Sequence, residues 1–303
     1  MPEYRALREK AGSFLSLCFN SGYAAEVTMQ PIHKFGMDAA ILFADILLIP
    51  MALGQDLKFE TGEGPKLGKL AVNGLMFKEE KLQPIYETLK LLTQQLKNSE
   101  TTLIGFAGAP WTVATYMVEG GSSREFSKAK SYPQMDELLN ILVESTSQYL
   151  ISQIKAGAEV VQIFDSWAGA LNGEQFENWV IKPNAKIIEN LRKFSPDTPI
   201  IAFPKGATED NLKKFCNIAK PDAISIDSST SLEWAFKNLN CVIQGNLDPQ
   251  VLLGDKPTIK LAAEKILKTA EGKPFIFNLG HGIIKETPVE NVEFLCGVIR
   301  NYK

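Results

Sequence analysis

The residues best suited to chemistry in this sequence follow short apolar segments. Asp45 follows ILFA, Ser166 lies just beyond VVQIF, Lys205 follows IAFP, Asp227 follows ISI, and His281 lies two residues beyond FIFNL. In parallel α/β folds the loops at the carboxyl ends of the strands converge on one face, where the active sites lie. If these apolar segments are such strands, the five side chains belong to one site.

Asp45 is the most informative of these residues. It interrupts a long apolar segment, residues 41–49, where an isolated carboxylate is costly to desolvate unless it has partners. A buried acid in such a setting is either held by internal donors or kept for a ligand that carries N–H donors. The second interpretation is the stronger one for Asp45.

The sequence contains two histidines, His33 and His281. His33 lies in a helical segment beside Lys34, which indicates an ordinary surface residue. His281 lies between Gly280 and Gly282 at the end of the last apolar segment, where the glycines free the backbone for close approach to a ligand. A functional role is therefore predicted for His281.

Four other polar residues have ordinary structural interpretations. Asp227 and Asp248 follow strands and are expected to cap the next helix or turn. Lys205 can pair with a neighbouring carboxylate, and Ser166 can be a turn hydroxyl at a strand end. These interpretations stay open beside the functional ones.

The elements that would position these residues alternate along the chain. Each apolar segment lacks clean polar alternation, as expected of strands covered on both faces. The predicted strands are residues 39–44, 101–106, 160–164, 199–203, 223–226, 241–245 and 275–279. Helical patterns separate them, which predicts a parallel sheet with right-handed crossovers.

Several helices have recognisable features. Residues 133–157 form a long helical pattern, and Val289, Val292, Cys296 and Ile299 form one apolar stripe. Two capping boxes are predicted, at residues 230–233 and 287–290. Before the first predicted strand, residues 2–19 and 22–36 read as helix. The sheet is therefore either an open doubly wound sheet of seven strands or a barrel without its first strand.

Composition excludes several classes of function. The net charge is −3 without a dense basic segment, which disfavours nucleic acid as a partner. No apolar segment is long enough to span a membrane, and no secretory leader is evident. The four cysteines are scattered, which fits a reducing cytoplasm and gives no spacing for a metal site. The usual glycine-rich nucleotide motifs are missing too.

Six segments in series resemble the uroporphyrinogen decarboxylase family. They occur in the family's order with similar spacing, so that together they are far more specific than any one of them. The segments are Pro2–Arg5, Phe43–Leu47, Gly108–Ser122, Phe164–Gly169, Gly245–Pro249 and Asn278–Gly282.

The resemblance implies one domain, residues 1–303, with the fold of a (β/α)8 TIM barrel. It implies a cytoplasmic homodimer that removes the four acetate carboxyls of uroporphyrinogen III, giving coproporphyrinogen III for haem biosynthesis without a cofactor or a metal. By position, Asp45 matches the aspartate that binds the pyrrole N–H groups, and Tyr116 matches the active-site tyrosine. Ser166 and His281 match substrate-binding residues.

The start of the sequence departs from this pattern. In the family, a first barrel strand and an Arg-Gln-Ala-Gly-Arg loop precede the segment that matches Pro2–Arg5, and those arginines bind substrate carboxylates. Here Met1 stands directly before Pro2. An N-terminally truncated barrel, one strand short, is therefore expected.

Two other functions stay open. Related barrels transfer methyl groups from corrinoids or thiols with a zinc ion bound by thiolate and histidine, although the required His-x-Cys pattern is absent here. The chain could also be an inactive product that only binds a tetrapyrrole.

Overall fold

The computed structural model describes residues 1–60, 64–123 and 125–302. Its main sheet is parallel, and its strands are β1 (Ala39–Ile41), β4 (Thr102–Gly108), β5 (Val160–Asp165), β6 (Ile200–Pro204), β7 (Ala223–Ser225), β8 (Val242–Leu247) and β9 (Phe275–Leu279). The strands pair in the order in which they occur along the chain, so each connection places the next strand of this sheet beside the previous one. All seven predicted strands are confirmed, although the first one ends at Ile41 rather than at residue 44.

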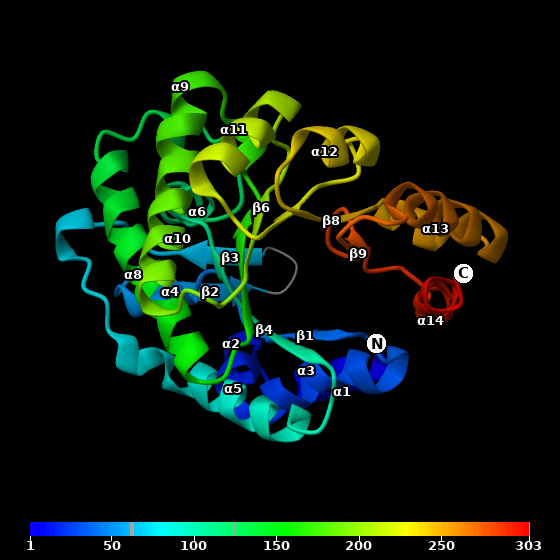
Figure 1. Ribbon diagram of the computed structural model, residues 1–303. Coiled ribbons are helices and arrows are strands. Elements are labelled where there is room, and N and C mark those ends of the chain that lie inside the picture. The colour runs from blue at the N-terminus through cyan, green and yellow to red at the C-terminus, as the bar shows by residue number, and fades with distance from the viewer. Residues whose placement is uncertain (61–63, 124, 303) are drawn as a thin grey trace.

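The sheet curls, and helices cover its outer face (Figure 1). The helices are α1 (Pro2–Lys10), α2 (Phe14–Phe19), α3 (Ser21–Phe35), α4 (Leu48–Ala52), α5 (Gln83–Leu96), α6 (Pro110–Glu119), α7 (Ser127–Lys130), α8 (Met135–Lys155), α9 (Gly173–Phe176), α10 (Lys182–Phe194), α11 (Glu209–Ala219), α12 (Leu232–Asn238), α13 (Lys256–Ala270) and α14 (Val289–Arg300). Short 3-10 or π turns are η1 (Val72–Gly74), η2 (Glu79–Leu82), η3 (Ala168–Ala170), η4 (Glu177–Ile181) and η5 (Pro249–Leu253). In the described part of the chain, no helix is both long and apolar enough to cross a membrane.

An antiparallel hairpin, β2 (Leu57–Glu60) with β3 (Gly64–Leu67), lies outside the main sheet. The sequence did not predict it, because LKFE and GPKL are too short and too polar to read as strands. Its position is set by the chain around it, since Leu67 N donates to Gly120 O beyond α6.

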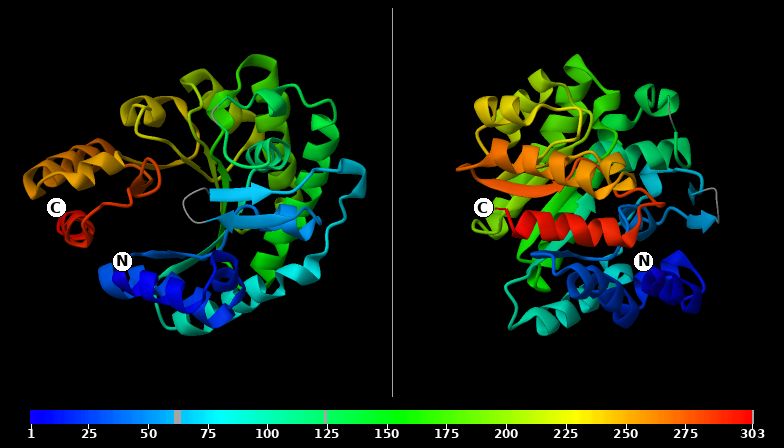
Figure 2. Two further views of the ribbon diagram at one scale, coloured as in Figure 1. Left: turned by 180° about the vertical axis from the view of Figure 1, so that it is seen from behind. Right: turned by 90° about the vertical axis from the view of Figure 1, so that its right-hand side faces the viewer.

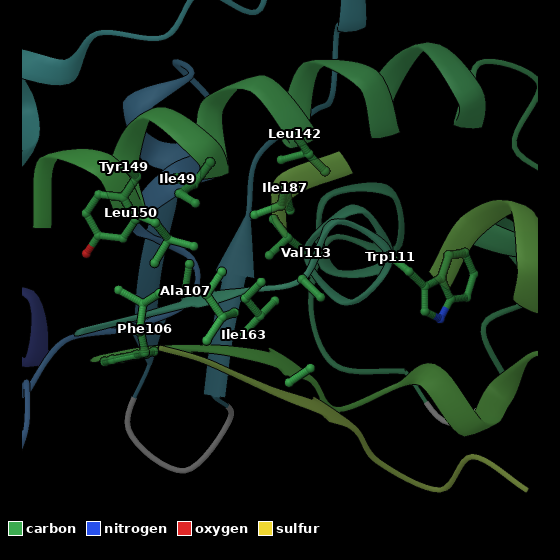
Figure 3. Close-up of a cluster of buried hydrophobic side chains, with 14 of the residues drawn as sticks. Ile49, Phe106, Ala107, Trp111, Val113, Leu142, Tyr149, Leu150, Ile163 and Ile187 are labelled. Atoms are coloured by element: carbon green, nitrogen blue, oxygen red, sulfur yellow. The ribbon is translucent and has the colours of Figure 1, made fainter. Parts of the chain in front are cut away.

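Side chains along the central strands alternate between the two faces of the sheet, and those on the outer face pack against the helices to form the core. Ala107 and Ile163 face the layer of helices, where Leu142, Leu150 and other apolar side chains of α6, α8 and α10 cover them (Figure 3). Phe106 lies on the opposite face of β4 (Figure 3). Each fully buried Leu or Ile of this layer contributes about 1.5–3 kcal/mol.

The inner face of the curled sheet carries a row of aromatic rings. Phe106, Phe164 and Phe203 lie on successive strands, with ring centroids 5.6 Å and 6.4 Å apart in edge-to-face contacts. Phe164 and Phe203 are register partners, whereas Phe106 pairs with Gln162 and lies two residues lower on its strand.

Two edges of the sheet face the same side of the molecule. Within the described residues, β1 and β9 each pair with one strand only, and they do not pair with each other. The contact between the two ends of the sheet is made by helices, since α14 lies against the end of α3 (Figure 2). Phe35, Val292 and Leu295 are buried in this contact.

Helix ends differ in part from the sequence-based expectations. The long helix α8 and the apolar stripe of α14 are confirmed. The cap of α12 is Ser231, not Thr230, and its hydroxyl accepts from Trp234 N. The capping box at residues 287–290 is wrong, because the N-cap of α14 is Pro288 and makes no side-chain cap. The helix expected over residues 2–19 is interrupted near Gly12, whose φ is +76°.

Candidate active site

Asp45 lies in the turn between β1 and α4. Three contacts hold this turn: Leu42 N donates to Ile104 O on β4, Phe43 N donates to the Thr28 hydroxyl on α3, and Ile46 packs against Gly108. A β-carbon at Gly108 would lie 2.8 Å from that of Ile46, so the glycine permits the close approach. The carboxylate therefore stands at the carboxyl end of the sheet, as predicted.

The Asp45 carboxylate has few internal partners. One oxygen accepts from Leu47 N at 2.8 Å, and no other side-chain hydrogen bond to Asp45 is present among the described residues. Burial raises the pKa of Asp45 to about 6, and the Leu47 hydrogen bond opposes the rise. At neutral pH the group is mainly ionised and half-buried, with lone pairs left for a ligand that supplies donors.

Tyr116 lies on the last turn of α6, in the same region as Asp45. Burial is the main cause that raises the pKa of its phenol, polar contacts with Ser122 and Trp167 oppose the rise, and the Asp45 charge adds to it. The ring of Tyr116 lies 6.1 Å from that of Trp167. The hydroxyl stays protonated at neutral pH and is a donor within the field of Asp45.

The loop that carries Ser166 is fixed by buried hydrogen bonds on both sides. The Thr112 hydroxyl donates to Asp165 at 2.6 Å and accepts from Trp167 N at 3.0 Å. Trp111 is fully buried, and its indole N–H donates to Trp167 O. The Ser166 hydroxyl itself has no hydrogen-bond partner in the described structure and is partly exposed.

Lys205 and His281 meet at the opposite side of the strand ends. Lys205 Nζ lies 3.0 Å from His281 Nε2. The carboxylate partner that the ordinary interpretation of Lys205 expected is not present among the described residues. His281 follows β9 and is exposed. His33 is exposed on α3, as expected of an ordinary surface residue. No local pattern in the sequence indicates the contact between Lys205 and His281, because β6 and β9 are far apart along the chain.

The ordinary interpretations of two aspartates are confirmed. Asp248 accepts from Gln250 N and caps η5. Asp227 accepts from Gly206 N at 2.7 Å and from Ser229 N at 2.9 Å, which ties the loop after β7 to the loop after β6. Both therefore have structural partners, although Asp227 lies close enough to influence His281.

The loop that carries Ser166 is connected through backbone hydrogen bonds to the loop that carries Lys205. Lys205 N donates to Asp165 O, and Gly169 N donates to Lys205 O, so the Ser166 loop and the Lys205 loop form one unit. Carboxylate, phenol, hydroxyl, amine and imidazole thus gather at one edge of a curled parallel sheet. The fold and this site define an enzyme of the parallel α/β barrel class.

Within that class the sequence comparisons are specific. The sequence model of the uroporphyrinogen decarboxylase family matches residues 1–302. The chain belongs to the uroporphyrinogen decarboxylase family.

Curated relatives agree over almost the whole chain. A uroporphyrinogen decarboxylase of Rhodospirillum rubrum is 46% identical over 313 residues, covering 99% of this chain and 89% of the relative. Another from Cereibacter sphaeroides is 47% identical over 316 residues, covering 99% of this chain and 91% of the relative.

Solved structures show the same fold at low sequence identity. A methyltransferase from Methanosarcina mazei has a TM-score of 0.78 at 18% identity and covers 97% of this chain and 89% of its own. A putative vitamin-B12-independent methionine synthase from Listeria monocytogenes has a TM-score of 0.60 at 13% identity, covering 99% and 92%. At such identities the likeness extends to the architecture alone.

Proposed function

We propose that the chain decarboxylates the four acetate side chains of uroporphyrinogen III and releases coproporphyrinogen III, without a cofactor. The observation that carries this proposal is the Asp45 carboxylate, which is half-buried, mainly ionised at neutral pH, and bound among the described residues only by Leu47 N. Four pyrrole N–H groups pointing to the centre of a macrocycle are the complementary donors. Each charge-assisted hydrogen bond is worth roughly 1.5–3 kcal/mol net.

The chemistry follows from the electron-rich pyrrole ring. Protonation of a ring carbon creates a cation, and the electrons released as CO₂ leaves the acetate flow into that cation. The resulting exocyclic methylene takes up a proton, and the ring carbon loses one, which leaves a methyl group on an intact pyrrole. Asp45 stabilises the cation, since a preorganised charge is typically the largest catalytic contribution.

The other residues bind and orient the substrate. Tyr116 offers a protonated phenol beside Asp45, and Ser166 offers a hydroxyl that has no hydrogen-bond partner in the part of the chain that the structure describes. His281 lies at the far side of the site, suited to a peripheral carboxylate. Asp45 and Tyr116 are the proposed catalytic residues, and all four residues are the proposed substrate-binding set.

The test is turnover by the Asp45→Asn variant. Anaerobic incubation with uroporphyrinogen III, followed by chromatography of the oxidised porphyrins, should give coproporphyrin with the wild-type chain and none with the variant. Asp197→Asn is a matched control, because Asp197 is an exposed carboxylate that precedes β6 and therefore lies toward the edge of the sheet opposite the site. Coproporphyrin formation by Asp45→Asn at the wild-type rate contradicts the proposal, and binding without turnover by the wild type indicates a tetrapyrrole-binding protein instead.

A zinc-dependent methyltransferase is less well supported. Such an enzyme needs a thiolate at the strand ends. The four cysteines are instead on α2, α11 and α14 and directly before β8 (Cys18, Cys216, Cys296 and Cys241). Cys241 precedes its strand and therefore lies at the edge opposite the candidate site.

We also propose a single-domain, cytoplasmic homodimer. All four cysteines are free, which fits a reducing compartment. Core residues from α3 to β8 form one continuous apolar cluster, as a single domain requires. Light scattering coupled to gel filtration measures the mass in solution, and a monomer mass of 33.5 kDa would contradict the dimer.

A further inference from the structure

The contact between Lys205 and His281 spans the mouth of the curled sheet. Lys205 follows β6 and His281 follows β9, with β7 and β8 between these strands in the sheet. Neither residue shares a loop or a helix with the other. The curl of the sheet alone brings the two side chains together, so the pair belongs to the face on which the candidate site lies.

The backbone around Lys205 is held on three sides. Lys205 N donates to Asp165 O at 3.1 Å, Gly169 N donates to Lys205 O at 2.9 Å, and Gly206 N donates to Asp227 Oδ2 at 2.7 Å. Gly206 has φ +74° and packs against Gly169, so this turn has little room to shift. A side chain that starts from such an anchor is preorganised.

The contact also fixes the proton of the imidazole. A lysine ammonium has three donors and no acceptor, so His281 Nε2 must accept the hydrogen bond at 3.0 Å. The proton of a neutral ring then lies on Nδ1. Desolvation is the main cause that lowers the pKa of His281, the Lys205 charge lowers it further, and the Asp227 charge opposes both.

Lys205 has no carboxylate partner of its own. No ion pair to Lys205 is present in residues 1–60, 64–123 and 125–302. The nearby Asp227 is already engaged, since its oxygens accept from Gly206 N, Ser229 N and the Ser229 hydroxyl. Two of the three ammonium donors remain available for a carboxylate, which binds a charged donor strongly. The Nδ1–H of His281 points away from Lys205 and can donate to a separate acceptor.

We propose that Lys205 binds a carboxylate of the substrate and holds His281 as the neutral, Nδ1-protonated ring, whose Nδ1–H donates to a second acceptor of the substrate. The proposed function supplies the identity of the ligand, a polycarboxylated tetrapyrrole. Lys205 is thereby both a binding residue and the positioning residue of His281.

The protonation of His281 is tested without substrate. His33 is the only other histidine of the sequence, so His33→Gln assigns the two imidazole signals in ¹⁵N spectra. The wild-type chain should show His281 protonated at Nδ1, with a pKa below the ordinary value of about 6.5. Lys205→Met should raise this pKa and populate the Nε2-protonated form. Nε2 protonation in the wild type, or an unchanged pKa in Lys205→Met, overturns the proposal.

The binding of substrate is tested by kinetics. Lys205→Met should raise KM for uroporphyrinogen III by about tenfold or more, the loss expected for a charge-assisted hydrogen bond, and Lys205→Arg should restore part of it. The control is Lys213→Met, which removes an exposed lysine of α11. Equal KM values for the wild type and Lys205→Met refute the role in binding.

The two proposals fail in distinguishable ways. If the wild-type chain binds uroporphyrinogen III without decarboxylating it, the proposed function fails. The dissociation constant, read from tryptophan quenching, then decides the role of Lys205: a weaker Lys205→Met complex supports it, and an unchanged one refutes it.

Discussion

Two aspartates of this chain have pKa values raised by burial, but they differ in their hydrogen-bond partners. Burial raises the pKa of both Asp45 and Asp165 to about 6. Asp165 is compensated by Thr112 at 2.6 Å and Asn184 at 3.3 Å, and it holds the Ser166 loop in place. Among the described residues, Asp45 accepts from Leu47 N alone. A carboxylate left short of donors in the free protein gains most from a ligand that brings them.

Because the Asp45 carboxylate accepts few hydrogen bonds in the free protein, we predict that Asp45→Asn stabilises the fold at neutral pH. The folded pKa of about 6 lies above the ordinary value of 3.8, so ionisation of Asp45 costs stability as the pH rises from about 4 through 6. A neutral amide avoids this cost, which amounts to at most about 2–3 kcal/mol, since one pKa unit is worth about 1.4 kcal/mol.

Urea unfolding at pH 7.5 and pH 5 measures this effect. The gain in the free energy of unfolding should be largest at pH 7.5 and should shrink at pH 5, where folded Asp45 is mostly protonated. Asp197→Asn, at an exposed carboxylate, should change little at either pH. A variant that is less stable than the wild type at both values would show that Asp45 supports the fold.

At the scale of elements, glycines decide how closely the strand ends meet. A β-carbon at Gly280 would lie 2.4 Å from Ser228 N, in the loop after β7. A β-carbon at Gly169 would lie 2.5 Å from Gly206 O, in the loop after β6. Both contacts are between backbones, which cannot yield as a flexible side chain would. The loops that carry Ser166, Lys205 and His281 are therefore in direct backbone contact with their neighbours.

Gly280→Ala should consequently displace His281 and impair the enzyme. Overpacking of this kind costs about 1–3 kcal/mol of stability, and a shift at the strand end should lower kcat/KM by roughly tenfold or more. Gly282→Ala is a matched control on the other side of His281, because a β-carbon there would have no atom within 4 Å. Similar losses in both variants would show that chain flexibility, rather than the backbone contact, matters here.

The sequence predicts the strands well because each is a compact apolar segment covered on both faces. It also locates Asp45 and His281, since a lone acid in an apolar run and a histidine between glycines are local signals. The pairing of Lys205 with His281 has no local signal, because it depends on the curl of four strands. The sequence pattern also cannot decide that Ser231 rather than Thr230 caps α12, since the two adjacent hydroxyls offer the same chemistry.

At the scale of the whole molecule, the curled sheet presents two unpaired edges. β1 and β9 expose Ile41 and Ile276, which are 42% and 40% accessible. Unpaired strands with exposed apolar side chains are templates for pairing with another chain. We therefore predict that the protein self-associates through the two edges that the described residues leave unpaired.

Ile276→Lys should reduce this self-association, because a charge on an edge strand opposes pairing with another strand. Static light scattering during incubation at 37 °C would follow it. Leu261→Lys is the matched control, since Leu261 is 73% exposed but lies on helix α13, away from the strand edges. If both variants suppress scattering equally, surface hydrophobicity in general is responsible, and the edge is not.

The contact of α14 with the end of α3 has a consequence for how the chain folds. Gly36 and Arg300 are in close contact although they lie near opposite ends of the sequence, a β-carbon at Gly36 falling 2.8 Å from Arg300 Nη1. Contacts between such distant residues raise contact order and slow folding. During synthesis the amino-terminal segments emerge first. The contact between α3 and α14 therefore cannot form until the last helix has been synthesised. The seam between the two ends is therefore expected to close last.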